Sequence, residues 1–285
     1  MEFCRKDSSN PMQVRYSAVQ GEERFPLLTF PALEKLDFVK HGFTTRMGGA
    51  SRGIFSTLNL SFTRGDDEEA VRENYRRVAQ AMQVEYEKIV CSDQTHTTNV
   101  RVIGEADAGK GLIYPKDYKN VDGMITNVPG ITLATFFADC VPLYFADPVH
   151  RAIGMSHSGW RGTVGRMGRA TLLKMKEQYG TDPEDVICAI GPSICMDCYE
   201  VSEDVADAFQ QEFPGWEKEI LLDKKNGKYQ LDLWKANEIV LIEAGVKKEH
   251  ISVTDICTCC NPGLLFSHRA SHGKRGNLGG FLCLR

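Results

Sequence analysis

The sequence lacks three features that each point to a particular class of protein. Its seven histidines include no His-x-His pair. A blue-copper oxidase needs several such pairs to hold its copper ions, so a conventional multicopper oxidase is nearly excluded. The longest apolar stretch is interrupted by Asp139 and Pro142, which makes it too short to span a membrane. The N-terminal residues contain no apolar run of the kind found in a secretory signal, so we expect a cytoplasmic protein.

An excess of positive charge is also missing. The chain has 285 residues, with 34 lysines and arginines against 38 acidic residues, and a formal net charge of −4. A basic surface for nucleic acid is therefore not expected, nor is a membrane partner. No repeat, low-complexity tract or flexible linker interrupts the sequence, which predicts one continuous catalytic domain over residues 1–285. The first 25 residues are polar and irregular, which is typical of either an early hairpin or a loose N-terminal arm.

Hydrophobic periodicity predicts helices that alternate with short strands. The helices are expected over 66–83, 163–179, 202–213 and 232–244. The strands are expected over 100–103, 131–137, 141–147, 151–157, 185–191 and 250–255. Asp66 is expected to cap the first helix, with Glu69 at capping-box spacing. The three strands between 131 and 157 follow one another closely, which predicts antiparallel pairing among them. A layered fold of mixed α/β (α+β) class follows.

Three residues of the types that bind zinc lie around the ends of predicted strands: His96, Cys140 and His157. Two imidazoles and a thiolate form a reasonable zinc ligand set, with a fourth position left for water or substrate. The spacings of 44 and 17 residues are too long for a local zinc knuckle, so the ligands have to converge through the fold. Two alternatives stay open. Either His157 activates Cys140 as a nucleophile without metal, or a core cysteine is simply flanked by two histidines.

Two glycine-containing loops are candidates for binding anions. In HSGWRGT, the charge of Arg161 and the backbone at Gly162 lie at the predicted start of a helix, which favours a phosphate site. The alternative is a tight strand–helix turn in which Arg161 pairs with a surface carboxylate. The loop TTRMGGASRGIFSTLNL offers Arg46 and Asn59 for contact with an anion or a ribose. It matches no phosphate-binding motif, so an ordinary loop is the alternative there.

Two further segments also leave alternatives open. Asp139 precedes Cys140, and in an extended segment the two side chains point to opposite faces, which makes Asp139 a structural acceptor. If the backbone turns before Pro142, both side chains line one pocket, and Asp139 becomes a candidate general acid or base. The ending FSHRASHGKRGNLGG carries His268 and His272 and is either a loop near a pocket or a solvated tail.

Five other cysteines form two clusters: Cys195 and Cys198, then Cys257, Cys259 and Cys260. Pooled, these thiols could ligate a structural zinc ion, and the first pair alone has the spacing of a redox motif. Without a secretory signal, we expect cytosolic thiols to stay reduced. Free buried thiols are therefore the expectation for all five.

Several motifs in the chain occur in one order. They are HGFTTRMGG-x-S-x-G, QTH, D-G-M-I-T-N-x-P-G, ADC-x-P, HSGWRGT, IGPSI-x-x-x-x-YEV and a final CT…FSHR. Together they resemble the bacterial polyphenol oxidoreductase/laccase-domain family, which has a human relative involved in purine metabolism. The resemblance runs from about His41 to the C-terminus and covers most of the chain.

The resemblance implies a four-layer α/β/β/α sandwich and a zinc ion bound by His96, Cys140 and His157. It also implies phosphorolysis of adenosine, inosine and methylthioadenosine, together with deamination of adenosine. Purine nucleosides and inorganic phosphate are then the expected partners, the cofactor is Zn²⁺ with copper as the alternative, and the protein is a monomer or a homodimer. The chain has Thr97 where Gly is common and Ser158 where Ala is common, which we expect to alter pocket shape and base preference.

Functions from other classes stay open on the residues alone. One is a metal-free hydrolase built on Cys140 and His157, and another is the copper-dependent polyphenol oxidase of the family's older name. A third is a non-enzymatic protein whose clefts bind another chain. Zinc analysis and turnover of nucleosides distinguish these possibilities.

Overall fold

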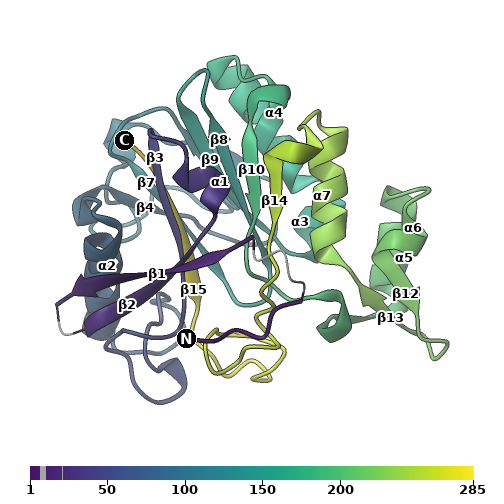
Figure 1. Ribbon diagram of the computed structural model, residues 1–285, viewed down its shortest axis with the longest axis horizontal. Helices are drawn as coiled ribbons and strands as arrows, with labels where there is room; N and C mark the ends of the chain where they lie inside the picture. Colours follow the sequence, from purple (N-terminus) through teal and green to yellow (C-terminus); the bar gives the residue numbers. More distant parts are fainter. Residues whose placement is uncertain (7–10, 21) are drawn as a thin grey trace.

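Two six-stranded sheets lie face to face at the centre of the structure, a computed structural model that describes residues 1–6, 11–20 and 22–285 (Figure 1). The first sheet has the order β1 (Gln13–Val19), β2 (Glu22–Thr29), β3 (Val39–Thr44), β15 (Leu278–Leu284), β7 (Thr132–Phe137) and β4 (Ile89–Cys91). The second has the order β14 (Ile251–Val253), β10 (Ile187–Ile190), β8 (Val141–Asp147), β9 (Ala152–Ser158), β6 (Gly123–Thr126) and β5 (Val100–Val102).

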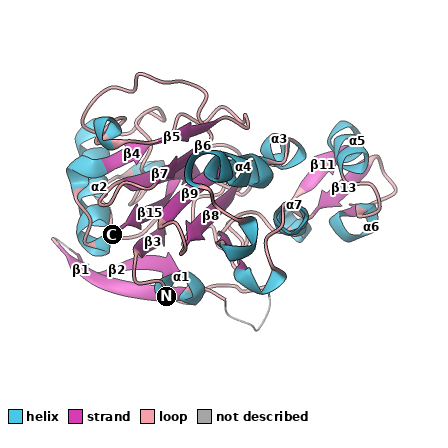
Figure 2. Ribbon diagram, turned by 90° about the horizontal axis from the view of Figure 1, so that it is seen from above, coloured by secondary structure: helices cyan, strands magenta, loops and turns pink. Residues whose placement is uncertain are grey.

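Helices cover the outer face of each sheet (Figure 2). On the first sheet lies α2 (Glu68–Met82), and on the second lie α4 (Met167–Tyr179) and α7 (Leu233–Glu243). Three clusters of buried apolar side chains fill the three spaces between these four layers. The arrangement confirms the mixed α/β class and the four-layer α/β/β/α sandwich.

The central strand β8 shows how one strand serves two of these clusters. All seven of its residues are buried. Tyr144 and Ala146 belong to the core between the two sheets, whereas Leu143 and Phe145 belong to the core under α4 and α7. Because successive side chains of a strand point to opposite faces, a strand covered on both sides reads as a continuous apolar run.

The antiparallel pairing predicted among the strands of residues 131–157 is correct for β8 and β9 but wrong for β7. Strand β7 lies in the first sheet, antiparallel to β15 and parallel to β4. The chain therefore crosses from one sheet to the other between Phe137 and Val141, and Asp139 adopts a left-handed backbone there, with φ of +87°. A buried strand reads the same in either sheet, so the local pattern could not predict this crossing.

The single helix predicted over 163–179 is also wrong. A short helix, α3 (Trp160–Val164), ends at Gly165, and α4 begins after Arg166, whose backbone is left-handed with φ of +58°. The Arg166 guanidinium forms ion pairs with Glu212 and Glu243. The partners of these ion pairs are distant in sequence, so helical periodicity could not predict the break between α3 and α4.

The other predicted helices are present. The N-cap of α2 is Asp67 rather than the predicted Asp66, since the Asp67 carboxylate accepts a hydrogen bond from the backbone N–H of Ala70 at 2.8 Å. In α7 the Asp232 carboxylate caps Lys235 at 2.9 Å, where the sequence places the helix start. The remaining helices are α1 (Pro31–Glu34), α5 (Glu203–Glu212) and α6 (Glu217–Ile220).

A small three-stranded sheet lies beside the sandwich, at the right of Figure 1, with α5 and α6 packed against it. Its strands are β11 (Glu200–Ser202), β13 (Lys228–Leu231) and β12 (Leu221–Asp223). At the other end of the chain, β1 and β2 pair as an antiparallel hairpin, and residues 7–10 and 21 lie outside the described residues. Among the described helices, none combines the length and the apolar character that crossing a bilayer requires.

One buried histidine in the first sheet makes stability depend on pH. His41 on β3 is 8% exposed, and its Nε2 accepts a hydrogen bond from the backbone N–H of Phe30 at 2.7 Å, which requires a neutral ring. Burial lowers its pKa from 6.5 to about 4, against a smaller opposing effect of Glu34. The unfolded chain therefore takes up the proton first. The stabilisation is complete above about pH 6.5 and is lost as the pH falls towards 4.

Replacing His41 by Gln is expected to flatten this pH dependence. The wild-type free energy of unfolding should fall between pH 7 and 4.5 by up to about 3 kcal/mol more than that of His41→Gln, since one pKa unit corresponds to about 1.4 kcal/mol. Urea unfolding at both pH values measures the difference, and His272→Gln, at an exposed position, serves as the control. Parallel curves for wild type and His41→Gln would contradict the prediction.

Candidate metal centre

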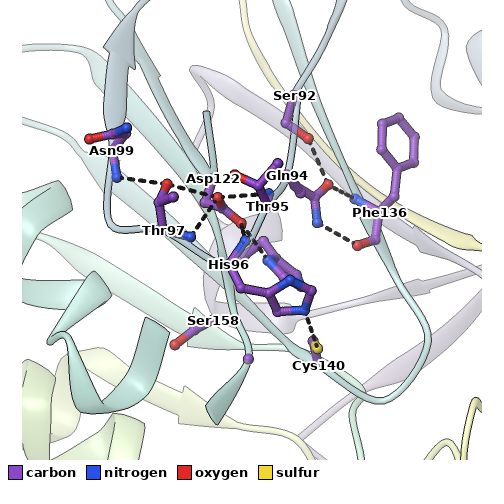
Figure 3. A network of polar contacts seen from close by, with 12 residues as sticks. Ser92, Gln94, Thr95, His96, Thr97, Asn99, Asp122, Phe136, Cys140 and Ser158 are labelled. Carbon is purple, nitrogen blue, oxygen red and sulfur yellow. Dashed lines mark hydrogen bonds and ion pairs between the residues drawn. The ribbon is translucent and has the colours of Figure 1, made fainter. Parts of the chain in front are cut away.

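The fold brings His96, Cys140 and His157 together, and Figure 3 shows His96 beside Cys140. His96 lies in the loop between β4 and β5, Cys140 lies at the end of the crossing into β8, and His157 lies near the end of β9. The pairing of Pro142 with His157 places the last two side by side. The Cys140 Sγ lies 3.9 Å from His96 Nε2, and the potential ligand atoms all lie within 4.8 Å of one another.

A single buried carboxylate positions two of the three ligands. Asp122 Oδ1 lies 2.8 Å from His157 Nδ1 and accepts the backbone N–H of His96 at 3.0 Å. Its Oδ2 accepts the backbone N–H groups of Thr95 and Thr97 at 3.0 and 2.9 Å. The turn therefore wraps around the carboxylate and stabilises the left-handed backbone of His96, whose φ is +65°. With Nδ1 of His157 facing Asp122, its Nε2 is left for a metal.

Gln94 ties the same loop to the first sheet. Its side-chain amide donates to the carbonyl of Phe136 at 2.8 Å and accepts from the backbone N–H of Phe136 at 2.7 Å. Its Oε1 also accepts from the Ser92 hydroxyl at 2.7 Å. Figure 3 shows these contacts to the right of Asp122. The ligand loop is thus held to both sheets, so metal binding loses less conformational entropy than it would with a flexible loop.

The electrostatics of the three residues favour a thiolate. Burial alone would raise the pKa of the Cys140 thiol, but the His157 and His96 rings lower it to about 6. Burial opposes protonation of His157, but Cys140 and Asp122 together raise its pKa to about 9. Asp122 is itself buried, yet the hydrogen bonds from His157 and the Thr95 and Thr97 backbone lower its pKa to about 2. A cation is therefore stabilised between Cys140 and Asp122, as a proton or as a metal.

The space among the ligands fits a zinc ion by its donor set and by its shape. Two imidazole nitrogens and one thiolate are borderline and soft ligands, the set that zinc prefers at three-ligand sites. The chain passes beside them at Gly159, where a Cβ atom would lie 3.0 Å from His96 Cδ2 and 3.1 Å from Cys140 Sγ. A side chain at residue 159 would crowd two ligands, so glycine keeps this space open.

Two hollows meet at these ligands. The first, which we call the aromatic lobe, has a volume of about 400 Å³. It is lined by Phe62, Tyr75, Phe136, Phe137, Asp93, Gln94, Lys116 and Asn277. The second, the arginine lobe, has a volume of about 410 Å³. It is lined by Arg64, Arg161, Arg269, Arg275, Asp139, Tyr199 and His268. His96 and Cys140 line both lobes, so a ligand in either one reaches the metal site, and Arg64 and Arg275 also line both.

The arginine lobe carries an excess of positive charge, because four arginines line it beside the single carboxylate of Asp139. Among the described residues, Arg275 forms no ion pair, and its buried Nε has no hydrogen-bond partner. Burial and the nearby charge of Arg64 lower the pKa of Arg275 to about 10. Arg161 stacks on the Trp160 ring at 4.3 Å. Such an excess of cations over carboxylates among the lining residues is typical of a site for an anion.

The other predicted site residues are placed differently. Arg46 donates to the carbonyls of Ser56 and Pro262, both at 2.8 Å. Asn59 is fully buried, and its side chain is bonded within the fold. The structure does not bring either residue to a lobe. Gly162 lies inside α3, which begins at Trp160, so the predicted helix start at Gly162 is wrong.

Asp139 lies in the arginine lobe, but its carboxylate is occupied. It accepts from the Thr258 hydroxyl and from the backbone N–H of Arg269, each at 2.7 Å. The backbone turns at Asp139, so Asp139 and Cys140 line one pocket as in the second alternative, and the carboxylate holds the loop containing His268 at the pocket wall. Both oxygens are hydrogen-bonded, so Asp139 positions the loop, and its role as a general acid or base stays a prediction.

The two departures from the family pattern lie behind the site. The Thr97 hydroxyl donates to Asp122 Oδ2 at 2.9 Å and thereby adds a hydrogen bond to the carboxylate that orients the ligands. The Ser158 hydroxyl is buried and bonded to Asn237 and Thr163. Neither side chain lines a lobe, so the expected effect on pocket shape and base preference stays a prediction.

Residues 40–285 of this chain match the family model described as multi-copper polyphenol oxidoreductase laccase, and this match decides the family. The chain belongs to this family. Purine nucleoside phosphorylase YlmD of Bacillus subtilis is 37% identical over 86% of this chain and 88% of its own. Adenosine deaminase RL5, from an unknown prokaryotic organism, is 34% identical over 83% of this chain and 93% of its own. The crystal structure of YlmD from Geobacillus stearothermophilus superposes with a TM-score of 0.85 at 32% identity, covering 100% of both chains.

For this member of the laccase family, the sequence did not point to three candidate site residues: Asp122, Arg64 and Arg275. Asp122 stands in the motif DGMITNVPG, and its role follows from the pairing of β6 with β9, which brings it beside His157. Arg64 and Arg275 are 211 positions apart in loops. A basic residue in a loop is usually solvated, so the sequence offers no signal that these two share a pocket.

Replacing Asp122 by Asn is expected to weaken metal binding about 10- to 100-fold, because an amide cannot accept from every donor that faces it. Its NH₂ group has to face either His157 Nδ1–H or the N–H groups of the turn. Competition with a chromophoric chelator measures the zinc affinity. Asp107→Asn is the matched control, because Asp107 is a buried carboxylate paired with Arg101 and Lys110 outside both lobes. Unchanged affinity in a folded Asp122→Asn protein would rule out the positioning role.

Proposed function

We propose that this protein is a purine nucleoside phosphorylase that acts on adenosine, inosine and methylthioadenosine and also deaminates adenosine. The observation that carries the proposal is the position of the three candidate ligands at the junction of an aromatic lobe and an arginine lobe. The names of the relatives support the two reactions, since one is a purine nucleoside phosphorylase and another an adenosine deaminase.

The two lobes suit the two substrates of phosphorolysis. Apolar side chains offer surface to a purine ring, and Phe62 stacks on Tyr75 at 5.7 Å in the aromatic lobe. Arg64 and Arg275 provide charge and hydrogen-bond donors for inorganic phosphate in the arginine lobe. A volume of about 400 Å³ lies within the range of small-molecule sites. The ribose then lies between the lobes, beside His96 and Cys140.

The proposed cofactor is zinc, bound by His96, Cys140 and His157. When bound, it supplies a Lewis acid and lowers the pKa of water to about 7. Asp122 holds the His157 ring in place, and Arg275 stabilises the negative charge of phosphate. The cytoplasmic location and the choice between monomer and homodimer stay predictions.

A single assay tests both reactions. Purified protein is incubated with adenosine, with and without phosphate, and adenine, inosine and hypoxanthine are separated by chromatography. Adenine that forms only with phosphate reports phosphorolysis, and inosine that forms without phosphate reports deamination. Inosine and methylthioadenosine replace adenosine in parallel reactions. Absence of every product from zinc-loaded protein would refute the proposed function.

A further inference from the structure

A second group of candidate metal ligands lies apart from the first. The thiols of Cys195, Cys198, Cys257 and Cys260 converge so that their sulfur atoms all lie within 4.8 Å of one another. Cys198 Sγ is 3.5 Å from Cys260 Sγ, and Cys195 Sγ is 4.0 Å from the same atom. None of the four is in a disulfide. No residue of this cluster belongs to the His96, Cys140 and His157 site.

The topology explains how residues 62 positions apart come together. Cys195 and Cys198 follow β10, and Cys257 and Cys260 follow β14. These two strands are parallel neighbours, so the segments after them leave the sheet at the same end. Each segment carries a C-x-x-C motif, and the second motif is Cys257-Thr258-Cys259-Cys260. Two C-x-x-C loops that face each other are the usual framework of a four-cysteine zinc site.

The backbone around the cluster is arranged for a negatively charged sulfur. The N–H groups of Cys195 and Cys260 point at Cys257 Sγ, at 3.2 and 3.4 Å. Hydrogen bonds from backbone N–H groups to a charged acceptor stabilise its charge. The Lys6 ammonium, paired with Asp197 at 2.9 Å, adds a positive charge that acts on Cys195 and Cys260.

We propose that Cys195, Cys198, Cys257 and Cys260 bind a structural zinc ion, independently of the function proposed above. Zinc–sulfur bonds of about 2.3 Å in a tetrahedron place the sulfurs about 3.8 Å apart. The separations of 3.5 and 4.0 Å bracket this value. Four protein ligands leave no open position, so the site is structural rather than catalytic. The proposal replaces the expectation of free buried thiols for these four cysteines.

Such an ion would hold in place two residues that line the arginine lobe. Ile194 and Tyr199, on either side of the first C-x-x-C motif, line that lobe. The Ile194 N–H donates to the carbonyl of Asp139 at 3.0 Å, and Thr258 in the second motif donates to the Asp139 carboxylate. Asp139 is the neighbour of Cys140. A metal that joins the two motifs would therefore fix the crossing that carries a ligand of the first site.

Zinc content tests the proposal with the first site disabled. The double variant His96→Ala/Cys140→Ala leaves the four-cysteine cluster intact. Elemental analysis should give about two zinc ions per wild-type chain and about one in the double variant. X-ray absorption at the zinc edge of the double variant should show four sulfur ligands at about 2.3 Å. A double variant with no zinc, or with nitrogen ligands to its zinc, would overturn the assignment.

A matched pair of cysteines gives the second test. Cys260→Ser removes one ligand, whereas Cys259→Ser changes a neighbouring thiol that is not among the four. In the wild-type background, zinc should fall from about two ions to about one in Cys260→Ser and stay at about two in Cys259→Ser. Iron in place of zinc would refute the proposal, as would an intact mass two daltons low from a disulfide within the cluster. Because the double variant keeps all four cysteines, misfolding of Cys260→Ser leaves the first test decisive.

Discussion

Zinc at the His96 site and both enzymatic activities are expected to be lost together when His96 or Cys140 is replaced by alanine. A bound metal ion contributes several kcal/mol to transition-state stabilisation, and each 1.36 kcal/mol corresponds to a factor of ten in rate. We therefore expect phosphorolysis and deamination to fall at least about a thousand-fold in each variant. Circular dichroism confirms folding, elemental analysis counts zinc, and chromatography measures both products.

His96→Ala also separates the metal site from a metal-free hydrolase. The thiol–imidazole pair of Cys140 and His157 survives in this variant, so a mechanism that needs only that pair would keep its activity. His272→Ala is the matched control, because His272 is an exposed histidine that lines neither lobe. If folded His96→Ala and Cys140→Ala proteins keep both reactions, the three-ligand metal site is wrong.

Local elements were predictable where a side chain acts on its own backbone. The start of α7 at Asp232 is one example, because an aspartate cap and an apolar stripe are both visible in sequence. The break at Arg166 was not predictable, because contacts with Glu212 and Glu243 accompany it from other helices. The same holds for β7. Its apolar run predicts a buried strand, but its sheet depends on pairing with β15, at the other end of the chain.

The three metal ligands were predictable from the sequence, whereas the role of the carboxylate that orients them was not. His96, Cys140 and His157 could be named from residue type and family resemblance, and the structure brings them together. Asp122 could not be given its role, since it acts on His157 through the pairing of β6 with β9 and on the 95–97 turn through backbone N–H groups. Spacing in sequence does not record either contact. A second C-x-x-C was present in the sequence, but only the parallel pairing of β10 and β14 places it beside the first.

The phosphate-binding residues show the strongest contrast. Arg46 was predicted from a glycine-rich loop, but its guanidinium is bonded to two backbone carbonyls and stacks on the Phe266 ring at 4.6 Å. Arg275 was not predicted, although its Nε is buried without a partner and faces the charge of Arg64. Arg275 donates through Nη1 to Asn277 and to the carbonyl of Gly276, so the two arginines differ at Nε, which is bonded in Arg46 and unbonded in Arg275. This property depends on tertiary contacts and is invisible in composition or motif.

Replacing Arg275 by Met is therefore expected to impair phosphorolysis selectively. Hydrogen bonds to a charged group contribute about 1.5–3 kcal/mol, so kcat/KM for phosphate should fall about 10- to 100-fold. Deamination of adenosine uses no phosphate and should change less than about threefold. The thermal midpoint should stay the same or rise, because the variant removes a buried cation whose pKa is lowered by burial and by Arg64. Initial rates at varied phosphate, and at varied adenosine without phosphate, measure the two effects.

Arg46→Lys is the control for Arg275→Met, because it changes an arginine that supports the fold and lines neither lobe. It keeps the positive charge but loses the fork that bonds Ser56 and Pro262, so it should lower the thermal midpoint and leave KM for phosphate unchanged. Arg275→Met is thus expected to change phosphorolysis and not to lower the thermal midpoint, whereas Arg46→Lys is expected to lower the thermal midpoint and not to change phosphate binding. Equal losses of phosphorolysis and deamination in Arg275→Met would argue against a phosphate site in the arginine lobe. In that case Arg275 would serve the reaction at the metal site itself, because it lines the same lobes as His96 and Cys140.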